Sequence, residues 1–404
     1  MAIKLLDVKT WLNKVFSLFF IAGFIFIPLT FYGLYYQYLL TKFLFLKPVS
    51  YIQNHFFGYA IKNIDFSSDT IALNILLCLL LALAFILILL LDFLKVRTFK
   101  IIPFFRSLSA YYIASILLKY GFDKIFKRQF SLPEPNILYT DFGGLTRDVL
   151  FWNAMGTSYS YSLVTGVVEI LTAVLILIKR TRTLGFCLSI GILGNILLIN
   201  FSFDISVKTF TAFLLCVVVF NVYPHIKNIY GFFVQHKQIK LVTTQQPGFR
   251  YNKWIRLFGG IGLVCYALFP YISSGNFNDD NTERPLLHGA YNVERFIIGN
   301  DTLNNSDFPY KRFFIHRNSY IIFQQRDDTM VDYYFEINPI KKQLELQDYK
   351  NNKITITYNY VEKTGNLQLR IGNNERWVIE SKSLNWKALP ALQDRMHYTI
   401  DEIK

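Results

Sequence analysis

One stretch constrains the fold of this chain more than any other: residues 71–91 contain no charged side chain, and Asn74 is their one strongly polar residue. An α-helix rises about 1.5 Å per residue and the hydrocarbon core of a bilayer is about 30 Å thick, so roughly twenty apolar residues make one crossing. The stretch therefore predicts a membrane-spanning helix. A composition of 52% hydrophobic and 17% charged residues agrees with a membrane protein.

Further apolar segments accompany this one, and together they predict about seven spans. The alternate loops that would face the cytoplasm with the N-terminus inside carry the larger share of Lys and Arg, which favours that orientation. An odd number of crossings then places everything after Ser273 on the outer side of a bacterial cytoplasmic (inner) membrane. The predicted spans lie near residues 15–40, 71–94, 101–122, 159–178, 184–200, 207–224 and 254–273.

The net positive charge lies in the apolar part of the chain. The first 275 residues hold 25 Lys and Arg against 10 Asp and Glu, whereas the remainder holds 17 against 18. Basic residues in loops between apolar segments are typical of cytoplasmic loops, so we expect a lipid bilayer and no nucleic acid as partner. The cysteines and histidines are scattered, which predicts no metal site and no cofactor motif.

From Asn276 onward the sequence is typical of β-structure. Apolar and polar residues alternate in segments such as 353–361 and 366–371, and short links rich in Asn and Gly separate them. We expect an antiparallel β-domain that forms a small barrel or a curved meander sheet, because closure removes open edges. The predicted strands are 290–298, 310–316, 319–325, 330–338, 341–348, 353–361, 366–371 and 375–381.

The stretch between the third and fourth spans, residues 132–161, is unusual for a loop. It combines two prolines and a Gly143-Gly144 pair with many aromatic residues, which favour the headgroup layer. We expect a short amphipathic or re-entrant piece on the outer surface, and the alternative is an extended polar loop.

Ionisable side chains inside apolar segments are costly, so they usually face a protein interior or a wet cavity. Lys119, Asp123 and Lys127 recur at a spacing of four, which places them on one helical face, although Lys127 could also extend to the headgroups. Glu169 lies near the middle of the fourth span without a charged neighbour in sequence. The predicted polar cluster comprises Lys119, Asp123, Lys124, Glu169, Asn195, Asn200, Asp204 and Lys208.

Two interpretations of this cluster are open. In the first, Glu169 pairs with Lys124 or Lys208 in a polar chamber that holds a quinone head group, a proton relay or another small polar ligand. In the second, the charges form structural ion pairs that fix helix packing. Asn195, close to two glycines, is expected to pack helices together and not to bind a ligand.

Three short motifs resemble the DoxX-like family of four-helix membrane proteins. They are Tyr120 to Lys124 at the end of one span, Gly166 to Glu169 in the next, and Lys179 to Gly185 in a tight inner loop. The resemblance covers residues 104–224 and carries over to Gly121, Lys124, Gly166, Glu169 and Arg182. It implies a four-helix core and, for some members, a subunit of a quinone-linked oxidoreductase. A more distant resemblance, to the membrane domain of vitamin K-dependent carboxylases, is the alternative.

These observations predict an α-helical polytopic membrane bundle with a C-terminal antiparallel β-domain. Its expected parts are an N-terminal helical hairpin (1–103), the DoxX-like core (104–224), a cytoplasmic loop with the last span (225–275) and an extracytoplasmic β-domain (276–404). The first functional hypothesis is an accessory or scaffold subunit of a cell-envelope complex, whose β-domain engages a protein partner. The alternatives are a quinone-linked oxidoreductase subunit that uses Lys124 and Glu169, and a small-molecule transporter.

Overall fold

The computed structural model describes residues 2–29, 33–57, 64–98, 100–238, 252–299, 301–303, 307–371, 377–393 and 399. They form two compact units, a helical unit (residues 1–125 and 164–275) and a barrel unit (residues 126–163 and 276–404). The chain therefore passes between the units three times. This division differs from the predicted domains, because residues 126–163 belong with the β-domain and the remaining helical parts form one unit. The centre of the predicted cytoplasmic loop, residues 239–251, lies outside the described residues.

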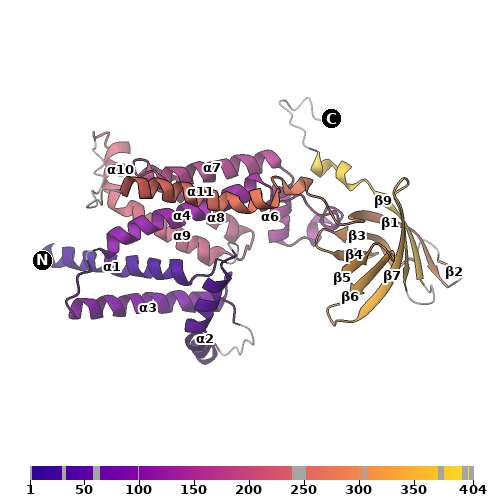
Figure 1. The fold of residues 1–404 in the computed structure, drawn as a ribbon, viewed down its shortest axis with the longest axis horizontal. Coiled ribbons are helices and arrows are strands. Elements are labelled where there is room, and N and C mark those ends of the chain that lie inside the picture. Colours follow the sequence, from indigo (N-terminus) through magenta and orange to yellow (C-terminus); the bar gives the residue numbers. More distant parts are fainter. Residues whose placement is uncertain are drawn as a thin grey trace. The chain divides into compact units, whose positions relative to one another are not determined.

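Within the described residues, seven helical stretches are long and apolar enough to cross a membrane, in agreement with the predicted number of spans. Figure 1 shows most of these helices lying along one common direction. The chain is thus a membrane protein. Its long helices are α1 (Ala2–Phe26), α2 (Tyr35–Phe57), α3 (Ile71–Phe93), α4 (Ile101–Ile125), α7 (Tyr159–Leu177), α8 (Arg182–Ser202), α9 (Lys208–Val222) and α11 (Asn252–Ser274), and the short helix α10 (Ile226–Phe233) follows α9.

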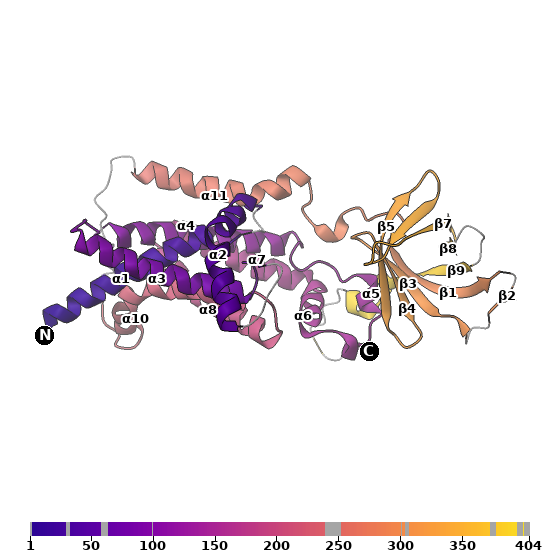
Figure 2. The same cartoon turned by 90° about the horizontal axis from the view of Figure 1, so that it is seen from below.

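The first predicted span, residues 15–40, is wrong at its C-terminal end. Helix α1 ends at Phe26, because Pro28 cannot continue the hydrogen-bond ladder and Gly33 takes a left-handed φ of 68°. The side-chain amide of Gln37 then donates to two carbonyl groups in the last turn of α1 and, at 2.9 Å, to that of Ile27 just after it. Helix α2 starts a new direction and runs across α1 and α3 (Figures 1 and 2).

Aromatic rings fill the contact between α1, α4 and α9. Phe20 lies 5.6 Å from Phe105 and 5.7 Å from Phe213, measured between ring centroids, and all three rings are buried. Gly23 permits this contact, since a Cβ there would lie 2.4 Å from the Phe213 ring. The core of this part of the helical unit is therefore set by close packing of large rings against a glycine.

The barrel unit contains a closed antiparallel meander of eight long strands, as the sequence predicted. Each strand pairs with the next along the chain, and β1 pairs with β9 as well as with β3, which closes the barrel. A short strand that was not predicted, β2 (Asp301–Thr302), pairs antiparallel with the last two residues of β1. The long strands are β1 (Gly289–Ile298), β3 (Tyr310–His316), β4 (Tyr320–Gln325), β5 (Met330–Asn338), β6 (Gln343–Gln347), β7 (Lys353–Val361), β8 (Asn366–Ile371) and β9 (Trp377–Leu384).

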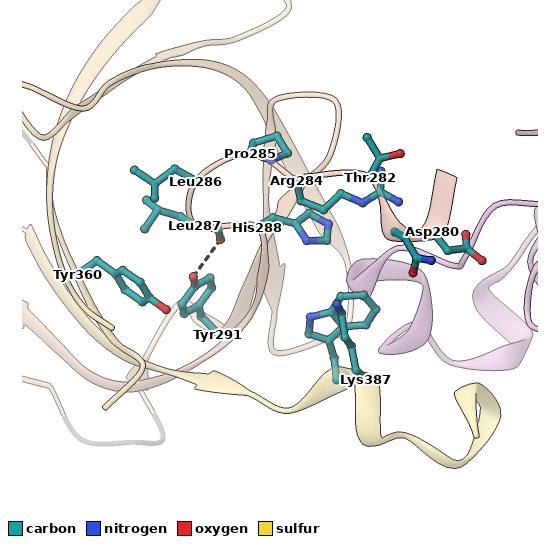
Figure 3. Close-up of a pocket in the computed structure, with 12 residues that line it drawn as sticks. Asp280, Thr282, Arg284, Pro285, Leu286, Leu287, His288, Tyr291, Tyr360 and Lys387 are labelled. Carbon is teal, nitrogen blue, oxygen red and sulfur yellow. Dashed lines mark hydrogen bonds between the residues drawn. The ribbon is translucent and has the colours of Figure 1, made fainter. Parts of the chain in front are cut away.

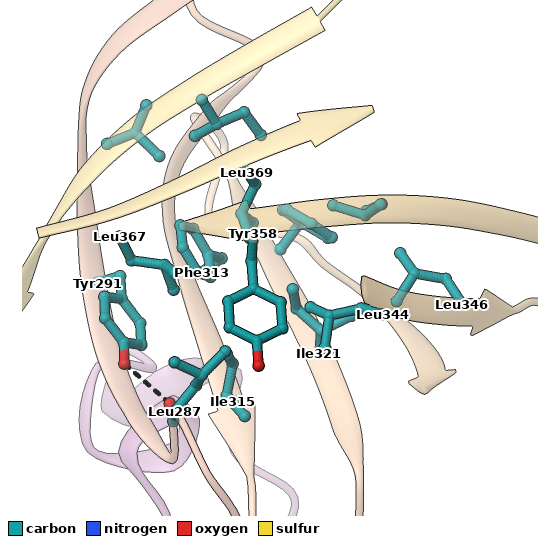
Figure 4. Close-up of a cluster of buried hydrophobic side chains, with 14 of the residues drawn as sticks. Leu287, Tyr291, Phe313, Ile315, Ile321, Leu344, Leu346, Tyr358, Leu367 and Leu369 are labelled. Atoms are coloured by element: carbon teal, nitrogen blue, oxygen red, sulfur yellow. Dashed lines mark hydrogen bonds between the residues drawn. The ribbon is translucent and has the colours of Figure 1, made fainter. Parts of the chain in front are cut away.

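Large apolar side chains occupy the inside of the barrel. Phe296, Phe313, Leu344 and Ile379 are fully buried there, and Figure 4 shows residues of this cluster converging from several strands. They come from alternate positions of their strands, as the period of two requires. The barrel is thus stabilised by a packed apolar core.

Residues 132–156 form short helices and not the extended polar loop of the alternative. These are α5 (Pro135–Leu138), the 3-10 turn η2 (Phe142–Gly144) and α6 (Arg147–Gly156). Tyr139, at the end of α5, stacks on the outward-facing ring of Phe314 with centroids 5.8 Å apart. The stretch therefore covers part of the outer face of the barrel.

Candidate functional site

The predicted motif glycines lie where α4 and α7 touch. A Cβ on Gly121 would lie 2.9 Å from the carbonyl oxygen of Gly166, and a Cβ on Gly166 would lie 2.6 Å from that of Gly121. Gly121 also borders Ile170 and Gly166 borders Ile125, so the two helices run antiparallel. Only glycine allows backbones to approach this closely.

The ion pair between Lys124 and Glu169 forms beside this glycine contact. Each residue follows its glycine by three positions, and side chains on a helix lean toward its N-terminus, so on antiparallel helices the two lean toward each other. Lys124 Nζ lies 2.8 Å from both carboxylate oxygens of Glu169. The exposed fractions of the two side chains are 8% and 5%. Of the two predicted partners of Glu169, the structure shows Lys124.

Lys119 and Asp123 form the predicted i,i+4 ion pair on α4. A third member of this group was not predicted: Tyr271 on α11, whose hydroxyl donates a hydrogen bond to Asp123. The prediction for Lys127 is wrong, because α4 ends at Ile125 and Lys127 has a left-handed φ of 58°. Instead of extending to headgroups, Lys127 is 1% exposed and pairs with Asp280, 3.3 Å away in the barrel unit.

The remaining members of the predicted cluster do not join Glu169. Lys208 pairs with Asp204 at 2.7 Å and lies 3.6 Å from Asp69, which also accepts hydrogen bonds from the first backbone N–H groups of α9. Asn200 is buried and donates to Thr211 Oγ1 at 3.0 Å, which links α8 to α9. The side chain of Asn195 is exposed within the described chain, so its predicted role in packing these helices is not supported.

Arg182, the last residue of the resemblance, lies at the first turn of α8. Its Nε donates to the carbonyl oxygen of Ile176 at 2.9 Å, and Thr181 Oγ1 donates to that of Leu175. Carbonyl groups at a helix C-terminus lack intrahelical partners, and cations near them are favourable. Arg182 therefore stabilises the tight turn between α7 and α8.

A second polar cluster, unpredicted by the sequence analysis, lies in the barrel unit around Glu134. His288 Nε2 lies 2.9 Å from one Glu134 oxygen, and the guanidinium of Arg317 bonds the other oxygen and also Asp279 at 2.7 Å. Burial alone would raise the pKa of Glu134, but hydrogen bonding to His288 and the charge of Arg317 outweigh it and hold this pKa at about 2. Glu134 is therefore a carboxylate that fastens the 132–139 stretch to the barrel.

Beside this cluster, one end of the barrel has a cavity of about 590 Å³. Figure 3 shows His288 between an aromatic side, formed by Tyr291 and Tyr360, and a polar side with Arg284. Tyr291 Oη donates to the carbonyl oxygen of Leu287 at 2.9 Å. The other lining residues are Asp280, Asn281, Thr282, Pro285, Leu286, Leu287, Trp386 and Lys387.

The fold defines a polytopic membrane protein that carries a closed eight-stranded antiparallel barrel. The chain is 34% identical over 124 residues to the uncharacterized protein YwoB of Bacillus subtilis (strain 168). This match covers 31% of the chain and 79% of the relative, so the chain belongs to the family of that protein. No family model matches the chain, and no solved structure matches it.

Proposed function

We propose that this protein is an accessory or scaffold subunit of a cell-envelope complex in the bacterial cytoplasmic membrane. Its N-terminus lies in the cytoplasm, and its barrel lies on the outer side and engages a protein partner. The observation that carries the proposal is the Lys124–Glu169 pair, whose two charges neutralise each other beside a tight helix crossing.

The geometry of this pair favours a structural role. The lysine contacts both carboxylate oxygens at 2.8 Å, and both side chains are buried. A catalytic acid or base needs an atom within hydrogen-bond reach of a substrate, whereas these groups are occupied by each other. A buried pair also fixes which faces of two helices meet, a role attested in other proteins.

The barrel unit supports the partner part of the proposal. Its stretch 126–163 and its strands are held together by the Glu134–Arg317 and Lys127–Asp280 pairs, so the barrel is fastened to the segment that joins α4 to α7. At the β6–β7 turn, Tyr349 is 81% exposed. The pairing register places this turn at the barrel end opposite to the β5–β6 turn and to the start of β1. Exposed tyrosines are enriched at the energetic centres of protein interfaces.

The quinone-linked oxidoreductase remains the second candidate. It is favoured by the predicted pairing of Lys124 with Glu169 and by the ring of Tyr120, whose centroid lies 5.6 Å from Lys124 Nζ. In this role Lys124 would hold or protonate a quinone oxygen, and Glu169 would relay protons. The resemblance to the DoxX-like family supports this candidate and the four-helix core alike.

Co-purification in mild detergent, with mass spectrometry of proteins and quinones, tests both candidates. The variants are the double substitution Lys124→Met with Glu169→Gln, the single substitution Tyr349→Ser, and Ile340→Ser as a control. Ile340 in the β5–β6 turn is 96% exposed and Tyr349 is 81% exposed, so both surface variants should fold. We expect Tyr349→Ser to lose a partner that Ile340→Ser and the double variant retain. Quinone that co-purifies with the wild type and disappears in the double variant would instead support the oxidoreductase.

A further inference from the structure

We propose that the cavity at the end of the barrel binds a small organic anion. In this arrangement Lys387 and Arg284 contact a carboxylate or phosphate group, and the aromatic side of the cavity contacts an apolar or aromatic body. The site is separate from the Lys124–Glu169 pair, and the proposal does not depend on the proposed protein partner.

The dimensions of the cavity fit a small molecule. Its volume of about 590 Å³ lies in the range of ligand pockets, roughly 300 to 1,000 Å³. Beyond it, the interior of the barrel is filled by side chains such as Phe313 and Leu344, which are fully buried. A compact ligand at the barrel end is therefore favoured over a long acyl chain inside the barrel.

The charges around the cavity favour an anion. Asp280 Oδ1 accepts a hydrogen bond from the backbone N–H of Leu132 at 2.7 Å, and Asp280 Oδ2 pairs with Lys127. Two further carboxylates are also occupied, Glu134 by Arg317 and His288, and Asp279 by Arg317 and Arg284. Each of these three carboxylates thus has a cationic partner, and Glu283, between Thr282 and Arg284, does not line the cavity.

Lys387 adds a positive charge to this balanced set. Its ammonium lies 5.6 Å from the centroid of the Trp386 ring, and among the described residues it has no acidic partner within 4.0 Å. Arg284 contacts Asp279 through Nη2, which leaves its other guanidinium N–H groups for further acceptors. A ligand anion would therefore meet one ammonium and one guanidinium at the rim.

The opposite wall combines apolar surface with a tyrosine hydroxyl group. The ring of Tyr291 is fixed by its bond to Leu287 O, whereas the hydroxyl of Tyr360 faces the cavity beside it (Figure 3). Aromatic rings with a hydroxyl group pack against an apolar body and still donate one hydrogen bond. A ligand with an aromatic ring and one anionic group matches both walls.

The segment between these walls is held in a defined conformation. Leu287 has a φ of 70°, which an L-residue adopts at a cost, and it is buried. The next residue, His288, is oriented by Glu134 and by the Trp386 ring, whose centroid lies 5.7 Å from that of the imidazole. Because the protein's own contacts fix this segment, the cavity is preorganised for binding.

Titration of the purified full chain with benzoate, phenyl phosphate and the uncharged analogue benzamide, followed by calorimetry, tests the proposal. Lys387→Gln is compared with Lys382→Gln, which removes the same charge from an exposed position of β9 outside the cavity. Tyr360→Phe removes one hydroxyl and keeps the ring. Circular dichroism verifies that each variant is folded.

We expect at least one of the two anions to bind more tightly than benzamide, and Lys387→Gln to raise its dissociation constant about tenfold. Tyr360→Phe should raise it by a smaller factor, and Lys382→Gln should leave it unchanged. If neither anion binds at 10 mM, the proposal is wrong, because even a weak site with a dissociation constant of ~10 mM would be half occupied at that concentration. Equal binding of benzamide, or equal effects of the two lysine substitutions, would also overturn it.

Discussion

Gly121 and Gly166 bring α4 and α7 into backbone contact, since a Cβ on either residue would lie less than 3.0 Å from the carbonyl oxygen of the other. The Lys124–Glu169 pair lies next to this contact. A glycine crossing and a buried ion pair at the same place indicate that the two helices have one fixed relative position. This position can be disturbed either through the backbone or through the charges.

Substitution of either glycine by alanine should separate the helices. We expect Gly121→Ala and Gly166→Ala to lower the free energy of unfolding by about 1 to 3 kcal/mol, because backbone atoms must shift. The matched control is Gly191→Ala on α8, where a Cβ has no neighbour within 4 Å and alanine is the better helix former. Thermal unfolding in detergent measures the three variants. Equal stability of all three would contradict the close crossing.

The ion pair should show strong coupling in a double-mutant cycle. Lys124→Met or Glu169→Gln alone leaves one buried charge without its partner, which costs about 3 to 5 kcal/mol. The double variant leaves no buried charge, so it should be more stable than either single variant. The same unfolding assay measures all four proteins. Additive losses would show that the two side chains do not interact.

Acid should loosen the barrel unit through Glu134. Its pKa is about 2 in the folded protein and near 4.5 ordinarily, so its contribution is present above pH 4.5 and is lost as the pH falls from 4.5 toward 2. A shift of this size corresponds to about 3 kcal/mol. Burial also lowers the pKa of His316 from its ordinary value of 6.5. Protonation of this imidazole therefore costs more in the folded protein, and stability falls as the pH drops below 6.5.

The measurement is the pH dependence of thermal unfolding for the wild type and Glu134→Gln. The variant should be less stable at neutral pH and should lose less stability between pH 4.5 and 2, whereas the His316 effect should persist. Glu345→Gln, which removes an exposed carboxylate on β6, serves as the control and should follow the wild-type curve. If Glu134→Gln had the wild-type slope, Glu134 would not be the group that titrates.

The two carboxylates near Lys208 should contribute differently to the free energy of unfolding. Asp69 accepts backbone hydrogen bonds of 3.0 and 2.7 Å from Lys208 and Thr209 at the start of α9, whereas Asp204 is 83% exposed. We expect Asp69→Asn to cost about 1 kcal/mol, as loss of a helix cap does. Asp204→Asn should cost about 0.5 kcal/mol or less, because exposed ion pairs contribute little. The reverse order, measured by thermal unfolding, would contradict the capping role.

The elements with strong local patterns were predictable from the sequence. Strands such as 310–316 and 353–361 coincide with β3 and β7, because side-chain alternation and turn residues depend on near neighbours. The apolar spans followed from length and hydropathy. The break after Phe26 could have been predicted as well, since Pro28 and Gly33 lie inside the first apolar segment.

The candidate sites were predictable only in part, because they depend on contacts between distant segments. Lys124 was one of two partners expected for Glu169, on the basis of the cost of burying single charges. Lys127 was misplaced, since nothing in its neighbours shows that α4 ends at Ile125 or that Asp280 is its partner. The contact of Glu134 with Arg317 joins residues 183 positions apart.

A short apolar run in the sequence indicates that strand β3 is covered on the outer face of the barrel. Phe313, Phe314 and Ile315 form a continuous apolar run, and all three are buried. Such a run is typical of a strand that is buried on both faces. The run therefore indicates a cover over β3, although the sequence does not identify the covering segment as α5 and Tyr139.

The most direct test of the proposed topology is cysteine labelling of Lys363→Cys in oriented membrane vesicles. Residue 363 lies exposed in the β7–β8 turn, whereas the native residues Cys78, Cys187, Cys216 and Cys265 all lie in spanning helices. A maleimide that cannot cross membranes should label the variant, and not the wild type, in right-side-out vesicles. Labelling of the variant only in inverted vesicles would contradict a barrel on the outer side of the membrane.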